Sequence, residues 1–217
     1  MNIRLRNRIK TVVFYPLVVV FLACILLHSI DRLYGWYNRR DNPTESITFS
    51  RGDIIYKVNS FILADTKYPH YGSLPGHLGI ILNDTTISVF NNDFEKILVA
   101  ESSLFNIKEK KIISIFRINP ADYNYKHARG RLFLIKTHLN DNQKEKLQQY
   151  VDLNRGKPYQ LFAEKNDSTS FNCATFVWSA FKYSANIDLD ENGGNMVFPT
   201  DILKYFMKKE RFEIIKL

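Results

Sequence analysis

Cys173 is the residue of this 217-residue sequence best suited to covalent chemistry. A polar stretch ends at Asn172, and apolar residues then recur with helical spacing over 173–185, which predicts a helix that begins near the thiol. The first turn of a helix offers a positive dipole end and unpaired backbone N–H groups, which favour a thiolate and can bind an oxyanion. The alternative is a small buried apolar residue, the usual environment of a free cysteine.

His77 is the best candidate for a base that activates this thiol. It stands in the run Gly-His-Leu-Gly, directly before an apolar stretch that predicts a buried strand. A histidine at the end of a strand can face the start of a helix, which is how papain-like sites place their base. The alternative is a histidine that ends a strand near solvent. His70 is a rival in a loop-like stretch, and His127 and His138 lack flanking glycines.

Glu101 and Tyr159 could complete the site. Glu101 ends a predicted strand one hairpin along from His77, where a carboxylate could fix the tautomer of the imidazole. A solvated acid at a strand end is the alternative. Tyr159 follows a Gly-Lys-Pro turn before Cys173, and its phenol could donate to an oxyanion. It could equally be a core tyrosine whose hydroxyl is satisfied.

The sequence predicts mainly strands in the first part of the domain and mainly helices in the second part, and these elements would position the side chains. Strands are expected over 51–58, 77–84, 86–90, 97–101, 111–118 and 131–139, with 86–90 as the hairpin partner of 77–84. Phe61 to Tyr71 is expected to be a short helix and loop. Helices are expected after Asn140, from Cys173, and from Pro199, and a last strand closes the chain. Strands with segregated helices predict an α+β domain.

The N-terminal segment predicts a membrane anchor. Thr11 to Ile30 has no charged residue when His28 is neutral, and twenty helical residues span roughly the 30 Å thickness of a bilayer. Basic residues flank the run on both sides, and their balance favours a single-pass protein with its N-terminus inside and its domain outside. A cleaved signal peptide and a buried globular helix are the alternatives. The expected organisation is an anchor over 1–37, a linker over 38–50 and a hydrolase domain over 51–217.

Composition excludes several other functions. The net charge of +8 is concentrated at the N-terminus, because residues 1–40 hold seven basic residues and one acidic residue. The remainder carries 23 basic and 21 acidic residues, so nucleic acid is not expected as a partner. The two cysteines, Cys24 and Cys173, form no disulfide framework, and no Cys/His cluster has zinc spacing. We expect no cofactor and no metal, and the oligomeric state is left open.

Six motifs, in this order, resemble the YiiX-like branch of the NlpC-type, papain-like hydrolases. The motifs are RGDIIY (51–56), GHLGIIL (76–82), AES (100–102), GKPYQLF (156–162), FNCATFVWSAF (171–181) and FPTDIL (198–203). That branch is circularly permuted, so that the histidine precedes the cysteine, and lecithin retinol acyltransferase is a distant member of the permuted group. The resemblance covers about residues 51–215.

The resemblance implies a permuted papain-like fold in which a small antiparallel sheet packs against the helix that carries the cysteine. It implies that Cys173 is the nucleophile and His77 the general base, that Glu101 orients His77, and that Tyr159 lies near the oxyanion. The family often has Tyr-Cys-Ser at the nucleophile, whereas this chain has Asn172-Cys173-Ala174. This departure leaves the expected nucleophile in place and changes the pocket around it, on which the substrate depends.

The expected function is hydrolysis of an amide or ester through a thioester on Cys173. Peptidoglycan peptides and lipid amides or esters are equally good substrate classes. An acyltransferase would use the same site with an alcohol or amine in place of water. A non-catalytic binding domain with a dormant Cys–His pair is the alternative from a different functional class.

Overall fold

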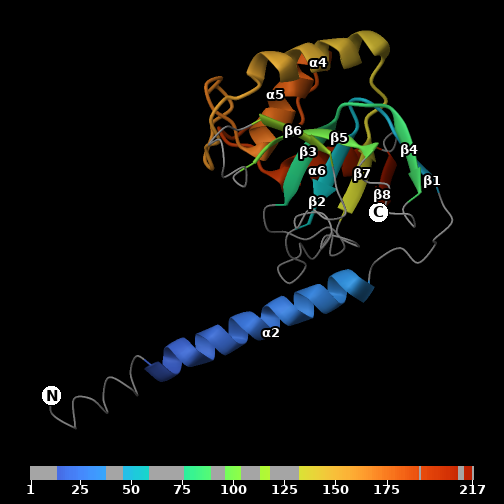
Figure 1. The fold of residues 1–217 in the computed structure, drawn as a ribbon. Helices are drawn as coiled ribbons and strands as arrows, with labels where there is room; N and C mark the ends of the chain where they lie inside the picture. Colours follow the sequence, from blue (N-terminus) through green and yellow to red (C-terminus); the bar gives the residue numbers. More distant parts are fainter. Residues whose placement is uncertain are drawn as a thin grey trace.

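The computed structural model describes residues 14–37, 46–58, 76–88, 96–103, 113–117, 132–190, 192–209 and 213–216. These residues form a six-stranded antiparallel sheet, a separate two-stranded ribbon and four α-helices (Figure 1). The expected α+β class is therefore correct. The expected short helix and loop over 61–71 lies outside the described residues, as do His70 and His127.

The six-stranded sheet has the order β6-β5-β3-β2-β7-β8, and all its neighbours are antiparallel. Its strands are β2 (Ile54–Lys57), β3 (His77–Ile81), β5 (Leu98–Ser102), β6 (Ile113–Arg117), β7 (Leu132–Lys136) and β8 (Glu213–Lys216). Short runs rich in Ile, Leu and Val form these strands, because branched side chains pack well on a pleated surface. The strand that begins at His77 lies inside the sheet, between β2 and β5.

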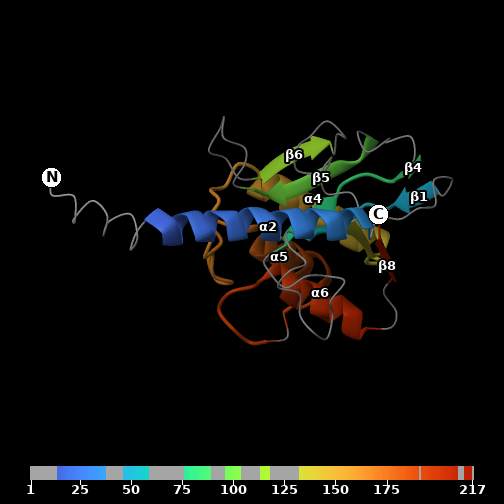
Figure 2. The ribbon, with the colours of Figure 1, turned by 90° about the horizontal axis from the view of Figure 1, so that it is seen from below.

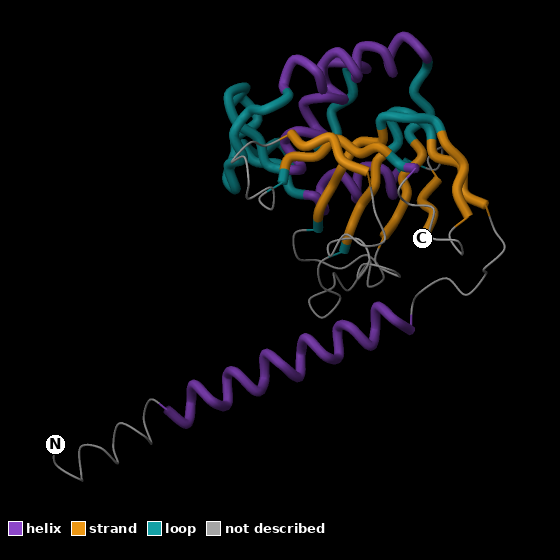
Figure 3. The backbone as a smooth tube through the Cα atoms, viewed as in Figure 1, coloured by secondary structure: helices purple, strands orange, loops and turns teal. Residues whose placement is uncertain are grey.

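Helices α4 (Asp141–Asn154), α5 (Cys173–Ala185) and α6 (Pro199–Lys208) cover one face of the sheet (Figure 3). Asn140 caps α4 through a capping box with Gln143. Pro199 stands in the first turn of α6, where its missing N–H costs nothing. The helix that begins with Cys173 packs directly on β3 and β5.

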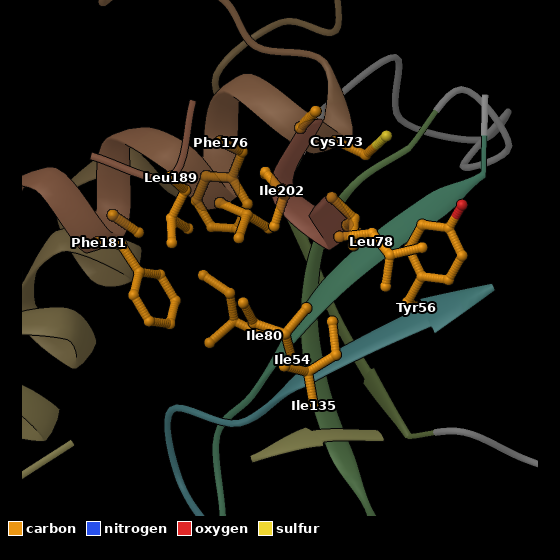
Figure 4. Close-up of a cluster of buried hydrophobic side chains, with 14 of the residues drawn as sticks. Ile54, Tyr56, Leu78, Ile80, Ile135, Cys173, Phe176, Phe181, Leu189 and Ile202 are labelled. Atoms are coloured by element: carbon orange, nitrogen blue, oxygen red, sulfur yellow. The ribbon is translucent and has the colours of Figure 1, made fainter. Parts of the chain in front are cut away.

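Side chains on opposite faces of the sheet enter two different cores, because successive residues of a strand point to opposite sides. Ile54, Tyr56 and Ile80 face the helices, where they meet residues such as Phe176 and Phe181 of α5 (Figure 4). The residues that alternate with them along the strands, such as Ile55 and Leu134, face the two-stranded ribbon instead. The sheet is thus buried on both sides, which explains its nearly continuous apolar runs.

Two expectations about the start of the domain are wrong. Residues 86–90 were expected to form a hairpin with 77–84, but β4 (Thr85–Ser88) pairs with β1 (Ser46–Phe49). Both edges of β3 are already occupied, by β2 and β5, so the chain after β3 must leave the sheet. The strand β1 lies within the expected linker 38–50, and its Ile47 and Phe49 are buried in the second core. The packed domain therefore begins before residue 51.

The N-terminal helix α2 (Tyr15–Tyr37) lies apart from the packed elements in Figure 1, and in Figure 2, which is seen from below, it crosses in front of them. Large apolar side chains along it are exposed, among them Leu17, Phe21 and Leu26, and Cys24 is exposed with them. In the part of the chain that the structure describes, no helix has both the length and the apolar character required to cross a membrane. The membrane anchor therefore stays a prediction.

Candidate active site

Cys173 is the first residue of α5, and its helix start is held by Asn172. The side-chain oxygen of Asn172 accepts hydrogen bonds from the backbone N–H groups of Ala174 and Thr175, at 2.9 and 2.8 Å. The hydroxyl of Thr175 accepts in return from the N–H of Asn172 at 2.9 Å. Among the described residues, the N–H of Cys173 has no such partner. This N–H remains available at the positive end of the helix for a developing oxyanion.

His77 and Glu101 form the closest polar contact of the site. The Nε2 atom of His77 lies 2.5 Å from Oε2 of Glu101, and the two side chains are 22% and 7% exposed. The Cys173 sulfur lies within hydrogen-bond reach of the same imidazole. Because Nε2 faces Glu101, Nδ1 is the ring nitrogen left for the sulfur. Carboxylate, imidazole and thiol therefore form one series of contacts, so the structure brings Glu101, His77 and Cys173 together.

Sheet register explains why Glu101 meets His77. The pairs Ile80↔Ala100 and Ile81↔Val99 join β3 to β5. Continuing this antiparallel register places Glu101 opposite Gly79, with His77 two residues away on the same face. Gly79 is required there, because a Cβ at this position would lie 2.4 Å from Cγ1 of Val99. The glycine leaves room on this face of the sheet for the side chain of Val99.

The pKa of His77 is strongly raised. Burial acts to lower it, but the negative charge of Glu101 and hydrogen bonds to Cys173 and Glu101 outweigh burial, and the pKa rises from 6.5 to about 10. At neutral pH the ring is therefore an imidazolium held between the carboxylate and the sulfur. The charged ring is a proton donor in contact with the Cys173 sulfur.

Strand β5 also holds the chain just before Cys173. The hydroxyl of Ser102, which is fully buried, donates to the carbonyl oxygen of Phe171 at 2.8 Å. Adjacent residues of one strand point to opposite faces, so Glu101 reaches His77 while Ser102 reaches the segment that leads into α5. Strand β5 thus places Glu101 next to His77 and also holds the segment that leads to Cys173.

Tyr159 lies in the segment before α5, where it forms a parallel β-bridge with Phe171. Burial and the neighbouring Cys173 raise the pKa of Tyr159 to about 12, so its phenol stays protonated and can donate a hydrogen bond. Its side chain is only partly buried, which leaves it accessible to a substrate. This placement is consistent with the predicted role near an oxyanion.

Sequence reasoning missed three residues that contact this site. Asn172 could have been recognised, because asparagine before an apolar-periodic run is a common N-cap. Ser102 and Tyr56 gave no separate signal, since their roles depend on tertiary contacts. The rival His138 is exposed at the end of the β7 segment, with φ of 51°. Within the described ranges, no cluster of three or more His, Cys, Asp or Glu side chains is placed to hold a metal ion.

The chain is similar to two proteins in comparisons of structure and sequence. The solved structure of the metalloprotein yiiX from Escherichia coli O157:H7 aligns with a TM-score of 0.49 and 15% identity, over 76% of this chain and 96% of that chain. The family that the sequence motifs resemble carries the name of this neighbour. The uncharacterized protein YycO from Bacillus subtilis (strain 168) is 31% identical over 84 residues. That match spans 37% of this chain and only 34% of YycO. No family model matches the chain.

Proposed function

We propose that this protein is a cysteine hydrolase of permuted papain-like type, with Cys173 as nucleophile. The observation that carries the proposal is the contact of His77 with Glu101 at 2.5 Å, on a ring that also meets the Cys173 sulfur. Three side chains from β3, β5 and α5 converge in the order that nucleophile, base and orienting acid require. In the chain the base precedes the nucleophile, the order that the permuted group has.

The proposed reaction runs through a thioester. The sulfur of Cys173 attacks the carbonyl carbon of an amide or ester, and the C=O electron pair moves to oxygen. The N–H of Cys173 and the Tyr159 hydroxyl stabilise this oxyanion. As the intermediate collapses, the bond to the leaving group breaks and His77 donates its proton to that group. Water then attacks the thioester, its proton returns to His77, and the acid product leaves.

Two substrate classes suit this site, and an acyltransferase would differ only in the final acceptor. Peptidoglycan peptides follow from the resemblance to NlpC-type hydrolases. One observation favours a substrate with an apolar acyl group: Leu161 and Phe162, next to Tyr159, are 56% and 65% exposed. The carbonyl oxygen of Leu161 accepts a hydrogen bond from the Asn172 side chain, which places this apolar turn beside the start of α5.

The test is to trap the acyl group on the enzyme. The protein is incubated with phospholipid vesicles or with purified muropeptides, quenched in acid, and digested for mass spectrometry. We expect an acyl adduct on the peptide that contains Cys173, with a mass that identifies the substrate class. Acid quenching preserves the adduct, because hydrolysis of the thioester needs hydroxide, or a neutral imidazole that activates water.

Two controls separate the hydrolase from a binding domain. Cys173→Ala removes the proposed acceptor, so any acyl adduct that remains in this variant is non-specific. A hydrolase acylates Cys173 alone. If neither substrate class labels Cys173, and iodoacetamide alkylates it no faster than free cysteine, the protein is not a thiol hydrolase and the binding domain is favoured.

We also propose that residues 11–30 attach the protein to the bacterial inner membrane. The exposed row of large apolar side chains on α2 supports this, because contiguous apolar surface of this kind mostly marks an interaction site. We expect the full chain to sediment with membranes and to resist extraction at high salt, and a variant that lacks residues 1–37 to be soluble. Recovery of the full chain in the soluble fraction would contradict the attachment.

A further inference from the structure

Tyr56 is a fully buried tyrosine whose hydroxyl lies at the active-site end of the core. It comes from β2 and pairs with Leu78 of β3, so that both side chains face α5. Figure 4 shows its hydroxyl at the same end of the buried cluster as the Cys173 sulfur. The two groups are close enough for the charge of the sulfur to act on the phenol. The mechanism above does not use this side chain.

The ring of Tyr56 also packs against the residue before His77. A Cβ on Gly76 would lie 2.8 Å from Cζ and 2.9 Å from Oη of Tyr56, and 2.5 Å from the carbonyl oxygen of Lys57. The glycine therefore lets the phenol pass directly over the backbone that leads into β3. Tyr56 thus touches the chain on the His77 side of the site while its hydroxyl faces the Cys173 side.

Burial determines which role the hydroxyl can have. The exposed fraction of Tyr56 is 0%, so a substrate cannot touch it, whereas Tyr159 is partly exposed. Burial, and then the charge of Cys173, raise the pKa of Tyr56 well above its ordinary value, so the phenol stays neutral. A neutral phenol beside a charged sulfur can stabilise it by hydrogen bonding or by its dipole.

We propose that Tyr56 is a positioning residue that stabilises the Cys173 thiolate and holds the Gly76–His77 backbone. Among the described residues, it acts with His77 from β3, through it Glu101 from β5, and Tyr159 from the segment before α5. The proposal rests on the proposed function only in taking Cys173 as a reactive thiol. It does not depend on which substrate is cleaved.

The test is the pH dependence of alkylation of Cys173 by iodoacetamide in the Tyr56→Phe variant. Phenylalanine keeps the ring over Gly76 and removes only the hydroxyl. Because one hydrogen bond to a charged group typically changes an equilibrium about tenfold, we expect the midpoint of the rate–pH profile to rise by about one pH unit. Tyr205→Phe, at a buried tyrosine of α6 in the same cluster, is the matched control and should leave the midpoint unchanged.

A purely structural role for Tyr56 would lower the melting temperature without moving the midpoint, and this result would overturn the proposal. If Tyr56→Phe folds poorly, 3-fluorotyrosine can replace all tyrosines in the Tyr159→Phe background. The fluorinated phenol is a stronger donor, so the midpoint should fall, and an unchanged midpoint would again contradict the proposal.

The alkylation and acyl-trapping experiments together distinguish failure of the proposed function from failure of the role proposed for Tyr56. If Cys173 alkylates rapidly with a midpoint that responds to Tyr56→Phe, but no acyl adduct forms on any substrate, the hydrolase is wrong and the role of Tyr56 stands. If Cys173 titrates like free cysteine and His77→Ala changes nothing, both are wrong.

Discussion

His77→Ala should lower turnover of an activated ester such as p-nitrophenyl acetate by about 10²- to 10⁴-fold, the contribution typical of a positioned acid–base group. The reason is that His77 supplies both the proton for the leaving group and the positive charge that favours the thiolate. Turnover is measured as release of p-nitrophenol at pH 7, alongside the rate of alkylation of Cys173. The alkylation rate should also fall, because a smaller fraction of the sulfur is ionised.

The control is His28→Ala on α2, which removes an equal amount of side chain outside the site. It should leave both rates within error of the wild type. Unchanged ester turnover in His77→Ala would show that another group activates Cys173, and the proposed pair would be wrong.

Glu101→Gln should move the basic limit of activity from about pH 10 toward pH 6.5. Glutamine keeps a hydrogen-bonding group beside Nε2 of His77 and removes the negative charge of Glu101, while the contact with Cys173, which also raises the pKa of His77, remains. The pKa of His77 should therefore fall toward 6.5, and turnover at pH 8 should fall by at most about 30-fold, because a pKa of 6.5 would leave about 3% of the ring charged at that pH. The measurement is a pH–rate profile from pH 5 to 11.

The same substitution should change how stability depends on pH. A raised pKa in the folded state adds stability that is fully present below about pH 6.5 and is lost as pH rises through about 10. We therefore expect the unfolding free energy of the wild type to fall between these pH values, and that of Glu101→Gln to be flatter. Glu213→Gln, at an exposed acid of β8, is the control. Identical pH profiles for Glu101→Gln and the wild type would refute the role of the carboxylate.

The side chains that meet at the candidate site could be singled out because each carries a local signal in the sequence. Cys173 is preceded by a polar stretch and followed by helical periodicity, and His77 begins a glycine-flanked apolar run. Glu101 could be placed because it ends the next strand of the sheet after His77. Most strands and helices followed from the same kinds of pattern, since a buried sheet and an amphipathic helix leave different spacings of apolar residues.

The pairing of β4 and the role of Tyr56 were not predictable from the sequence. A short apolar run does not show which strand it will join, and β4 joined β1, 38 residues earlier, where Thr48 and Thr86 share a hydrogen bond. Tyr56 belongs to an ordinary strand pattern, and only the tertiary structure brings its hydroxyl to the thiol. The role of Asn172 was predictable only in part, because its capping of α5 is local in sequence but its hydrogen bond to Leu161 is not.

Convergence of the site from distant parts of the chain has a consequence for folding kinetics. The contact between His77 and Glu101 closes a loop of 24 residues, and the bond from Ser102 to Phe171 closes one of 69 residues. Contacts between residues so far apart form slowly, because the entropy of loop closure is lost before the contact is made. During refolding α5 can form early from local interactions, but Cys173 gains its charged partner only when β3, β5 and α5 have docked. The reactivity of this thiol therefore reports the last stage of assembly, and not the formation of the helix that carries it.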